Sequence, residues 1–167
     1  RAALNLSSVY RHMGDFAAAT QTMRDLNPVL PRITDPSLKA PLYLHAATNS
    51  ARTGDWQRAE PLFLAGIETA INAGDMQTAA VGWNQLGYMR LQGNDLAKAE
   101  AALTEAFRIR RLAGNRNLGA SYTYLGMLRL AQGDSRSALN LPIRPLSSNA
   151  STDHLSEAAG KARRSSR

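Results

Sequence analysis

One short motif returns at a nearly constant interval and limits what this chain can fold into. At four places a glycine is followed, directly or after one residue, by an aspartate, and an alanine follows at a matching distance. The motifs are Gly14-Asp15, Gly54-Asp55, Gly93-Asn94-Asp95 and Gly133-Asp134, and the alanines are Ala19, Ala59, Ala99 and Ala138. The alanines are separated by steps of 40, 40 and 39 residues. A period of this length indicates an array of equivalent small units rather than one irregular core.

Apolar residues within each unit recur with the period of an α-helix. In the third unit one face is predicted to hold Leu96, Ala99, Leu103, Ala106 and Phe107. Their spacing follows the i, i+3, i+4, i+7 rule of an amphipathic helix, and the alternation typical of strands is absent. The first helix of the first unit is likewise predicted to have one apolar face, which is made of Leu4, Leu6, Val9 and Met13. Each unit therefore predicts a helix, a tight turn and a second helix.

The residues of the repeated motif have separate physical roles. A glycine that ends a helix accepts the left-handed backbone conformation that a β-carbon disfavours. The aspartate after it can cap the next helix by accepting hydrogen bonds from free backbone amides. In the third unit Asn94 stands where the glycine is expected, and asparagine tolerates this conformation better than most residues. The alanine allows the two helices to cross closely.

The units resemble the tetratricopeptide repeat, whose first helix carries Trp, then Leu-Gly, then Tyr. The third unit has Trp83, Leu86-Gly87 and Arg90 at these positions, and the fourth has Tyr122, Leu125-Gly126 and Arg129. The step is longer than the usual repeat of about 34 residues. It is similar to the extended repeats of kinesin light chain, of maltose-activator-like transcription factors and of arrays joined to CHAT protease domains. The resemblance implies an all-α fold, a right-handed α-solenoid of antiparallel helix pairs that forms a TPR-like superhelix.

The array is expected to occupy residues 1–141. Its four helix pairs are expected at residues 1–27, 40–73, 76–113 and 117–141. Residues 28–41 contain four prolines, which predicts a loop in which Pro41 opens the next helix. Residues 142–167 are rich in serine and arginine and are expected to be a disordered tail. The chain begins with Arg1 rather than methionine, which suggests a fragment that lacks its native N-terminus.

In arrays of this family the first helix of each pair lines a concave groove, so the resemblance implies a set of groove residues. They are Asn5, Val9, His12 and Met13, then Leu44, Thr48, Ala51 and Arg52, then Asn84, Tyr88, Leu91 and Gln92, and finally Thr123, Met127 and Leu130. Asparagine amides can donate to and accept from the backbone of an extended peptide, and Arg52 can bind a carboxylate with two hydrogen bonds. Ordinary solvated helix surface is the alternative interpretation.

The sequence therefore predicts a protein–protein interaction scaffold that binds a peptide or helix in this groove, as part of a larger bacterial regulatory or signalling protein. The expected partner is a protein or peptide, either separate or another domain of the same full-length chain. The alternative is a ligand-sensing regulatory module of a transcription factor or CHAT-type protease whose effector domain lies outside this chain. Repeat ends without a polar cap also offer a route to self-association.

Several classes of function find no support in the sequence. The chain has no cysteine, which excludes disulfides, thiolate metal sites and thiol catalysis. His12, His45 and His154 do not share a metal-ligand spacing, and no phosphate-binding loop or dinucleotide fingerprint is present. Neither an enzyme nor a cofactor is expected.

The charge of the chain suggests no specific partner. The net charge is +7, and one basic cluster comprises Arg108, Arg110, Arg111 and Arg116. Cations at the end of a helix complement its dipole, and the basic tail lacks the aromatics of nucleic-acid readers, so specific nucleic-acid binding is not expected. No apolar run approaches the roughly 18 residues of a membrane span, and the expected location is the cytoplasm.

Overall fold

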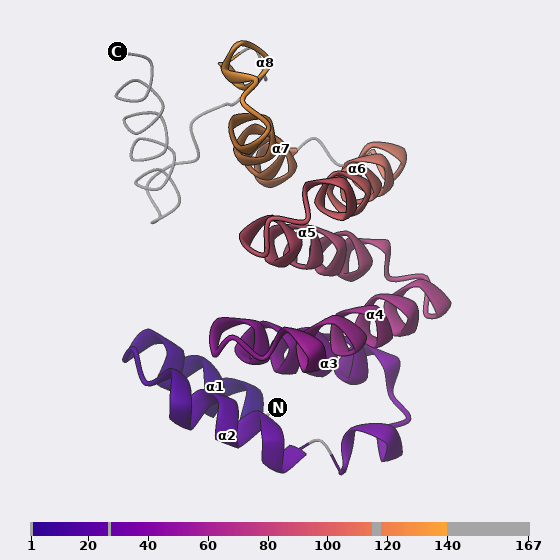
Figure 1. The fold of residues 1–167 in the computed structure, drawn as a ribbon. Coiled ribbons are helices and arrows are strands. Elements are labelled where there is room, and N and C mark those ends of the chain that lie inside the picture. The colour runs from indigo at the N-terminus through magenta and orange to yellow at the C-terminus, as the bar shows by residue number, and fades with distance from the viewer. Residues whose placement is uncertain (1, 27, 115–117, 140–167) are drawn as a thin grey trace. The chain divides into compact units, whose positions relative to one another are not determined.

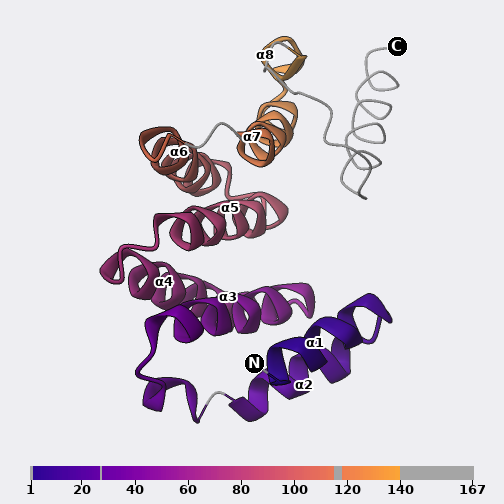
Figure 2. The same cartoon turned by 180° about the vertical axis from the view of Figure 1, so that it is seen from behind.

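The structure is a computed structural model, and it describes residues 2–26, 28–114 and 118–139. Figure 1 shows the fold and Figure 2 shows it from behind. The elements are α1 (Ala2–His12), α2 (Phe16–Leu26), a 3-10 helix (Leu30–Arg32), α3 (Pro36–Arg52), α4 (Trp56–Asn72), α5 (Met76–Gln92), α6 (Leu96–Leu112), α7 (Gly119–Ala131) and α8 (Ser135–Leu139). The described ranges contain no strand, so the all-α prediction is confirmed for them.

The chain divides into two compact units between Leu86 and Gly87, within α5. In the first unit α1 packs on α2, α2 on α3 and α3 on α4. In the second unit α6 packs on α7 and α7 on α8. Among the described residues, no helix is both long and apolar enough to cross a lipid bilayer. Consecutive helices therefore form a repeat-like series within each unit.

The turns between helices share one backbone design. After α3, Gly54 has a φ of 81°, and the amide of Asp55 donates to the carbonyl of Ser50 at 2.9 Å, which is the long hydrogen bond of a Schellman motif. The Asp55 carboxylate then accepts a hydrogen bond from the backbone amide of Arg58 at 3.2 Å and caps α4. The same two bonds are made by Asp15, Asp75, Asp95 and Asp134. The predicted roles of glycine and aspartate are confirmed at these turns.

The third unit confirms the prediction for its displaced glycine. Asn94 has a φ of 60°, and among the described residues it is the one non-glycine residue with a positive φ. The backbone thus places the left-handed residue directly before Asp95, as it places Gly54 directly before Asp55. The position of the turn is fixed by the aspartate cap, and the residue before it adapts.

The structure also shows that the aspartate cap recurs at half the interval seen in the sequence motif. Capping aspartates occur every 20 residues from Asp15 to Asp95, including Asp35 before α3 and Asp75 before α5. Each of α3, α4, α5 and α6 accordingly has 17 residues. The turn between α4 and α5, which joins two pairs, is therefore built like the turns within the pairs.

The proline-rich segment differs from the prediction. The expected loop over residues 28–41 is wrong in its second part, because α3 begins at Pro36 and Pro41 lies inside it. Asp35 caps this helix by accepting from the amide of Ser37 at 2.9 Å, and a proline in the first turn sacrifices no helical hydrogen bond. The cap and Pro36 start the helix before Pro41, which then interrupts only one backbone bond.

Small residues bring the helices into close contact. Ala19, Ala59 and Ala99 are each 0% exposed, and Ala138 is 6% exposed. In the second unit Ala99, Leu103 and Leu128 form a buried cluster between α6 and α7. The four alanines of the repeated motif are thus buried, as a close helix crossing predicts.

Candidate functional site

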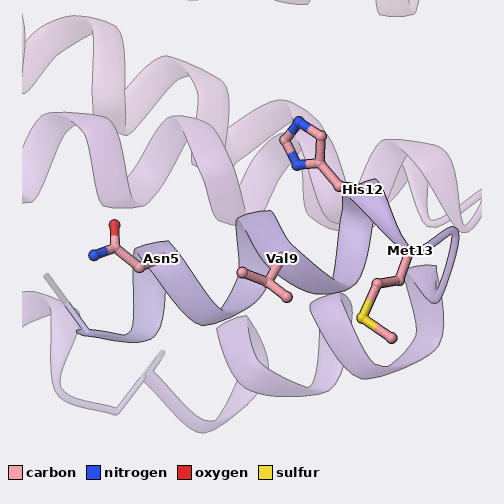
Figure 3. Close-up of a pocket in the computed structure, with 4 residues that line it drawn as sticks. All are labelled: Asn5, Val9, His12 and Met13. Carbon is pink, nitrogen blue, oxygen red and sulfur yellow. The ribbon is translucent and has the colours of Figure 1, made fainter.

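The four residues predicted for the first part of the groove lie around one hollow on α1. Asn5, Val9 and His12 of α1 line it together with Met13, which directly follows the helix, and Figure 3 shows their side chains. Val9 is 52% exposed and Met13 is 74% exposed. Its lining combines two apolar side chains, Val9 and Met13, with two polar ones, Asn5 and His12.

A second hollow, of about 140 Å³, lies between α3 and the first half of α5, within the first unit. Its lining residues are Pro41, Leu44 and His45 from α3 and Thr78, Val81 and Gln85 from α5. At its border the Thr48 hydroxyl donates to the carbonyl of Leu44 at 2.8 Å and lies 3.5 Å from Oε1 of Gln85. Two residues of the predicted groove, Leu44 and Thr48, therefore meet here with side chains of α5 that the sequence did not single out.

Three other predicted groove residues are buried or packed against the core. Asn84 is 2% exposed and Thr123 is 7% exposed, so neither presents its side chain to a partner in this conformation. The Thr123 hydroxyl donates to the carbonyl of Gly119 at 3.0 Å, within its own helix. Leu91 packs against the buried cluster between α6 and α7.

The remaining predicted residues are more accessible. Arg52 and Gln92 are exposed and are the last residues of α3 and α5, and His12 ends α1 in the same way. Tyr88 is half-buried, with its ring centroid 5.4 Å from that of Tyr124 and the two planes tilted by 48°. Burial, with a smaller contribution from Tyr88, raises the pKa of the Tyr124 phenol. Met127 and Ala51 are half-buried, as is Leu130.

The repeat step moves the predicted groove position in α1 by one residue. Steps of 40, 40 and 39 residues relate Val9 to Asn49, Met89 and Leu128 rather than to the groove positions Thr48, Tyr88 and Met127. Asn49, Met89 and Leu128 are 2%, 5% and 0% exposed. One residue turns an α-helix by about 100°. Val9 therefore lies at the register of residues that the later first helices bury, and the same steps relate the predicted groove positions Thr48, Tyr88 and Met127 to sequence position 8.

The basic cluster predicted at the end of α6 does not form one surface. Arg108 makes a two-pronged ion pair with Glu105, with both nitrogen–oxygen distances at 2.7 Å. Arg110 points inward, is 6% exposed and has Nη1 at 3.3 Å from the Ser121 hydroxyl. Arg111 is exposed, and Arg116 lies outside the described residues.

The sequence itself indicates that Arg110 points inward, although a count of charged residues does not show it. Arg110 stands four and seven residues after Ala106 and Leu103, which puts it on the buried face of α6. Burial lowers the pKa of its guanidinium. Periodicity, rather than residue type, identifies which arginine of the cluster belongs to the core.

No group of three or more histidine, cysteine or acidic side chains in the described ranges could hold a metal ion. His12 and His45 line the two separate hollows. His154 and the predicted tail at 142–167 lie outside the described residues. The chain matches no known protein-family model, and no curated protein is recognisably similar to it.

Proposed function

We propose that this chain is a tetratricopeptide-like interaction scaffold that holds a peptide or helix of a partner protein along its first helices, arranged as a right-handed α-solenoid. The observation that carries the proposal is the hollow between α3 and α5, which lies between the first helices of two successive pairs. The equivalent turns that follow α1, α3, α4, α5 and α7 support the repeated arrangement that such a surface requires.

The chemistry of this hollow suits a peptide side chain. Leu44 and Val81 supply apolar lining, and Thr48 and Gln85 place a hydroxyl and an amide at its edge. Its volume of about 140 Å³ is smaller than the roughly 300–1,000 Å³ of typical small-molecule sites. A single apolar side chain fits this space, with backbone groups of the peptide within reach of the polar edge.

Charge further specifies the partner. Arg52 is exposed at the end of α3, on the helix that lines the hollow, and a guanidinium binds carboxylates with two parallel hydrogen bonds. The whole chain carries a net charge of +7, which attracts acidic molecules. The expected peptide therefore has an apolar anchor residue near an acidic side chain or a C-terminal carboxylate.

A selection experiment tests this proposal. A phage-displayed library of random dodecapeptides is selected on the full chain, and the affinity of the selected peptides is measured by fluorescence anisotropy. We expect apolar–acidic peptides whose affinity falls at least tenfold for the double variant Arg52→Ala, Gln85→Ala. The matched control is Arg111→Ala, Gln57→Ala, which removes the same side-chain types from exposed positions on the second helices α6 and α4.

The result that contradicts the proposal is also defined. If no peptide is selected, or if both double variants weaken binding equally, the hollow between α3 and α5 is not the binding surface. A thermal shift caused by a small metabolite, without any selected peptide, favours the ligand-sensing alternative instead.

A further inference from the structure

The hollow between α3 and α5 is bordered by helices without acidic residues. Neither α3 nor α5 contains an aspartate or a glutamate within its bounds. The carboxylates that directly precede these helices, Asp35 and Asp75, each accept a hydrogen bond from a backbone amide as helix caps. Arg52 is exposed one helical turn after Thr48, which lies at the border of the hollow. The charge around the hollow therefore favours an anchor side chain that has acidic neighbours.

One stretch of this chain has that composition. Residues 140–167 lie outside the described residues, and their sequence contains two acidic side chains, Asp153 and Glu157. Leu155 stands between them, two residues from each. The other large apolar residues of this stretch lie near a basic residue, Arg144, instead, and they are Leu141, Ile143 and Leu146. Leu155 is therefore the residue of this stretch that matches the peptide expected in the hollow.

We propose that residues 153–157, with the sequence Asp-His-Leu-Ser-Glu, are a ligand that this chain itself supplies to the hollow between α3 and α5. Leu155 is the anchor and contacts Leu44 and Val81 of the lining. A carboxylate next to the anchor binds the guanidinium of Arg52. The inference rests on the proposed function, because it names a segment of this chain as a peptide that the hollow holds.

The occupied hollow regulates access for other partners. A partner protein that uses the same hollow has to displace residues 153–157 before it binds. The stretch around Arg144 does not serve in their place, because it would bring a second cation towards Arg52 and like charges repel. Acidic anchors from other proteins therefore compete with one defined segment of this chain.

Peptide binding tests the inference directly. The probe is a synthetic peptide of residues 149–161 with an N-terminal fluorescein, and the control probe is residues 140–152, which has the same length and contains apolar residues but no acidic one. The receptor is the full chain with Leu155→Ser, so that its own segment does not compete. We expect fluorescence anisotropy to show at least tenfold tighter binding of the first probe.

Variants of the receptor locate the contact. The double variant Arg52→Ala, Gln85→Ala should weaken the binding of the 149–161 probe at least tenfold. The matched control Arg111→Ala, Gln57→Ala, at exposed positions on α6 and α4, should leave the affinity unchanged. If both double variants bind the probe equally, the segment does not bind in the hollow and the inference is overturned.

Variants of the probe separate the anchor from its charges. Leu155→Ser in the probe removes the anchor, and Asp153→Asn with Glu157→Gln removes the charges but keeps the shape. Each change should weaken the binding of the probe at least fivefold. An affinity that neither change alters overturns the assigned roles of Leu155 and its acidic neighbours.

The full chain provides an independent test, because its sequence contains no cysteine. Val81→Cys places a single thiol in the lining of the hollow, and its rate of alkylation by iodoacetamide reports whether the hollow is occupied. The rate is measured at chain concentrations above the dissociation constant of the 149–161 probe. Adding Leu155→Ser should raise it at least threefold. Leu112→Cys, at a position 75% exposed on α6, is the control and should react equally with and without Leu155→Ser.

The outcomes distinguish this inference from the proposed function. Equal binding of the two probes, or alkylation of Val81→Cys that Leu155→Ser does not change, overturns the inference. If peptides selected from the random library bind the hollow and the 149–161 probe does not, only the inference fails and the proposed function stands. If neither the selected peptides nor the probe binds, both fail.

Discussion

The side-chain amide nitrogen of Asn49 lies 3.0 Å from the hydroxyl oxygen of Ser7, 42 residues earlier in the chain. Both groups also point at the carbonyl of Ala19, at 3.3 Å and 3.4 Å. Asn49 is 2% exposed and Ser7 is 0% exposed. One buried polar triangle therefore ties α3 to both helices of the first pair.

The first prediction is that Asn49→Ala loosens this junction. The substitution removes the donor that serves two buried oxygens, and we expect a loss of about 1–3 kcal/mol in the free energy of unfolding. Urea denaturation followed by tryptophan fluorescence measures the loss. Hydrogen exchange in α1 and α2 should accelerate more than in α6, and a uniform acceleration contradicts the proposed junction.

The second prediction replaces both polar residues, Ser7 and Asn49, by apolar residues found at the same positions in other units. Met89 and Leu128 stand at the position of Asn49, and Ala47 stands at that of Ser7. We expect the double variant Ser7→Ala, Asn49→Met to be more stable than Asn49→Ala, since replacing both polar partners avoids a buried group without a hydrogen bond. If the double variant is no more stable than Asn49→Ala in the same urea assay, the broken hydrogen bonds of the triangle do not account for the stability lost in Asn49→Ala.

Much of the fold could be predicted from sequence because its determinants are local. The aspartate caps and the left-handed Asn94 depend on a few neighbouring residues, and both occur as predicted. The start of α3 was missed because Asp35 lacks a preceding glycine and its cap was hidden among prolines. Local patterns thus identify helices well, but prolines obscure where one begins.

The candidate site could be predicted less well, because exposure depends on contacts between helices. Asn84 and Leu91 have suitable chemistry for a groove, yet one is buried and the other packs against α6 and α7. The displacement of Val9 from the groove comes from a register difference of one residue, which the helix converts into a large rotation. Val81 and Gln85 of α5 could be assigned to the hollow only once the packing of α3 and α5 was known.

The third prediction concerns the two kinds of glycine in the turns. Gly54 has a φ of 81°, so Gly54→Ala should cost about 1–2 kcal/mol although its surroundings are open. Gly93 lies outside the left-handed region, and a β-carbon there meets only ordinary contacts at 3.6 Å or more. Gly93→Ala is therefore the matched control and should leave stability unchanged or slightly raised. Equal losses of melting temperature contradict this distinction.

The fourth prediction is a dependence of stability on pH through the cap of α5. Hydrogen bonds from the Thr78 hydroxyl and backbone amide lower the pKa of Asp75. A lowered carboxyl pKa gives stability that is present above the ordinary value of about 3.9 and is lost as the pH falls through the folded-state pKa. Asp75→Ala should cost about 1 kcal/mol at pH 7. The difference from the wild type should shrink below about pH 4.

The control for this experiment is Glu68→Ala, which removes an exposed carboxylate from α4 outside any turn. It should leave the melting temperature nearly unchanged at pH 7. A loss for Asp75→Ala that stays constant from pH 7 to pH 3 contradicts the role of the ionised cap.

The last prediction separates the charge of Arg110 from its volume. The Nε of Arg110 makes no hydrogen bond to the described residues. Burial disfavours the charged guanidinium and therefore lowers the pKa of Arg110. Arg110→Met keeps most of the volume and removes the buried charge, so we expect stability equal to the wild type or higher by up to about 2 kcal/mol. Arg110→Ala leaves a cavity between α6 and α7 and should cost about 2 kcal/mol or more. If methionine destabilises the chain as much as alanine in urea denaturation, the hydrogen bond to Ser121, rather than side-chain packing, holds this interface.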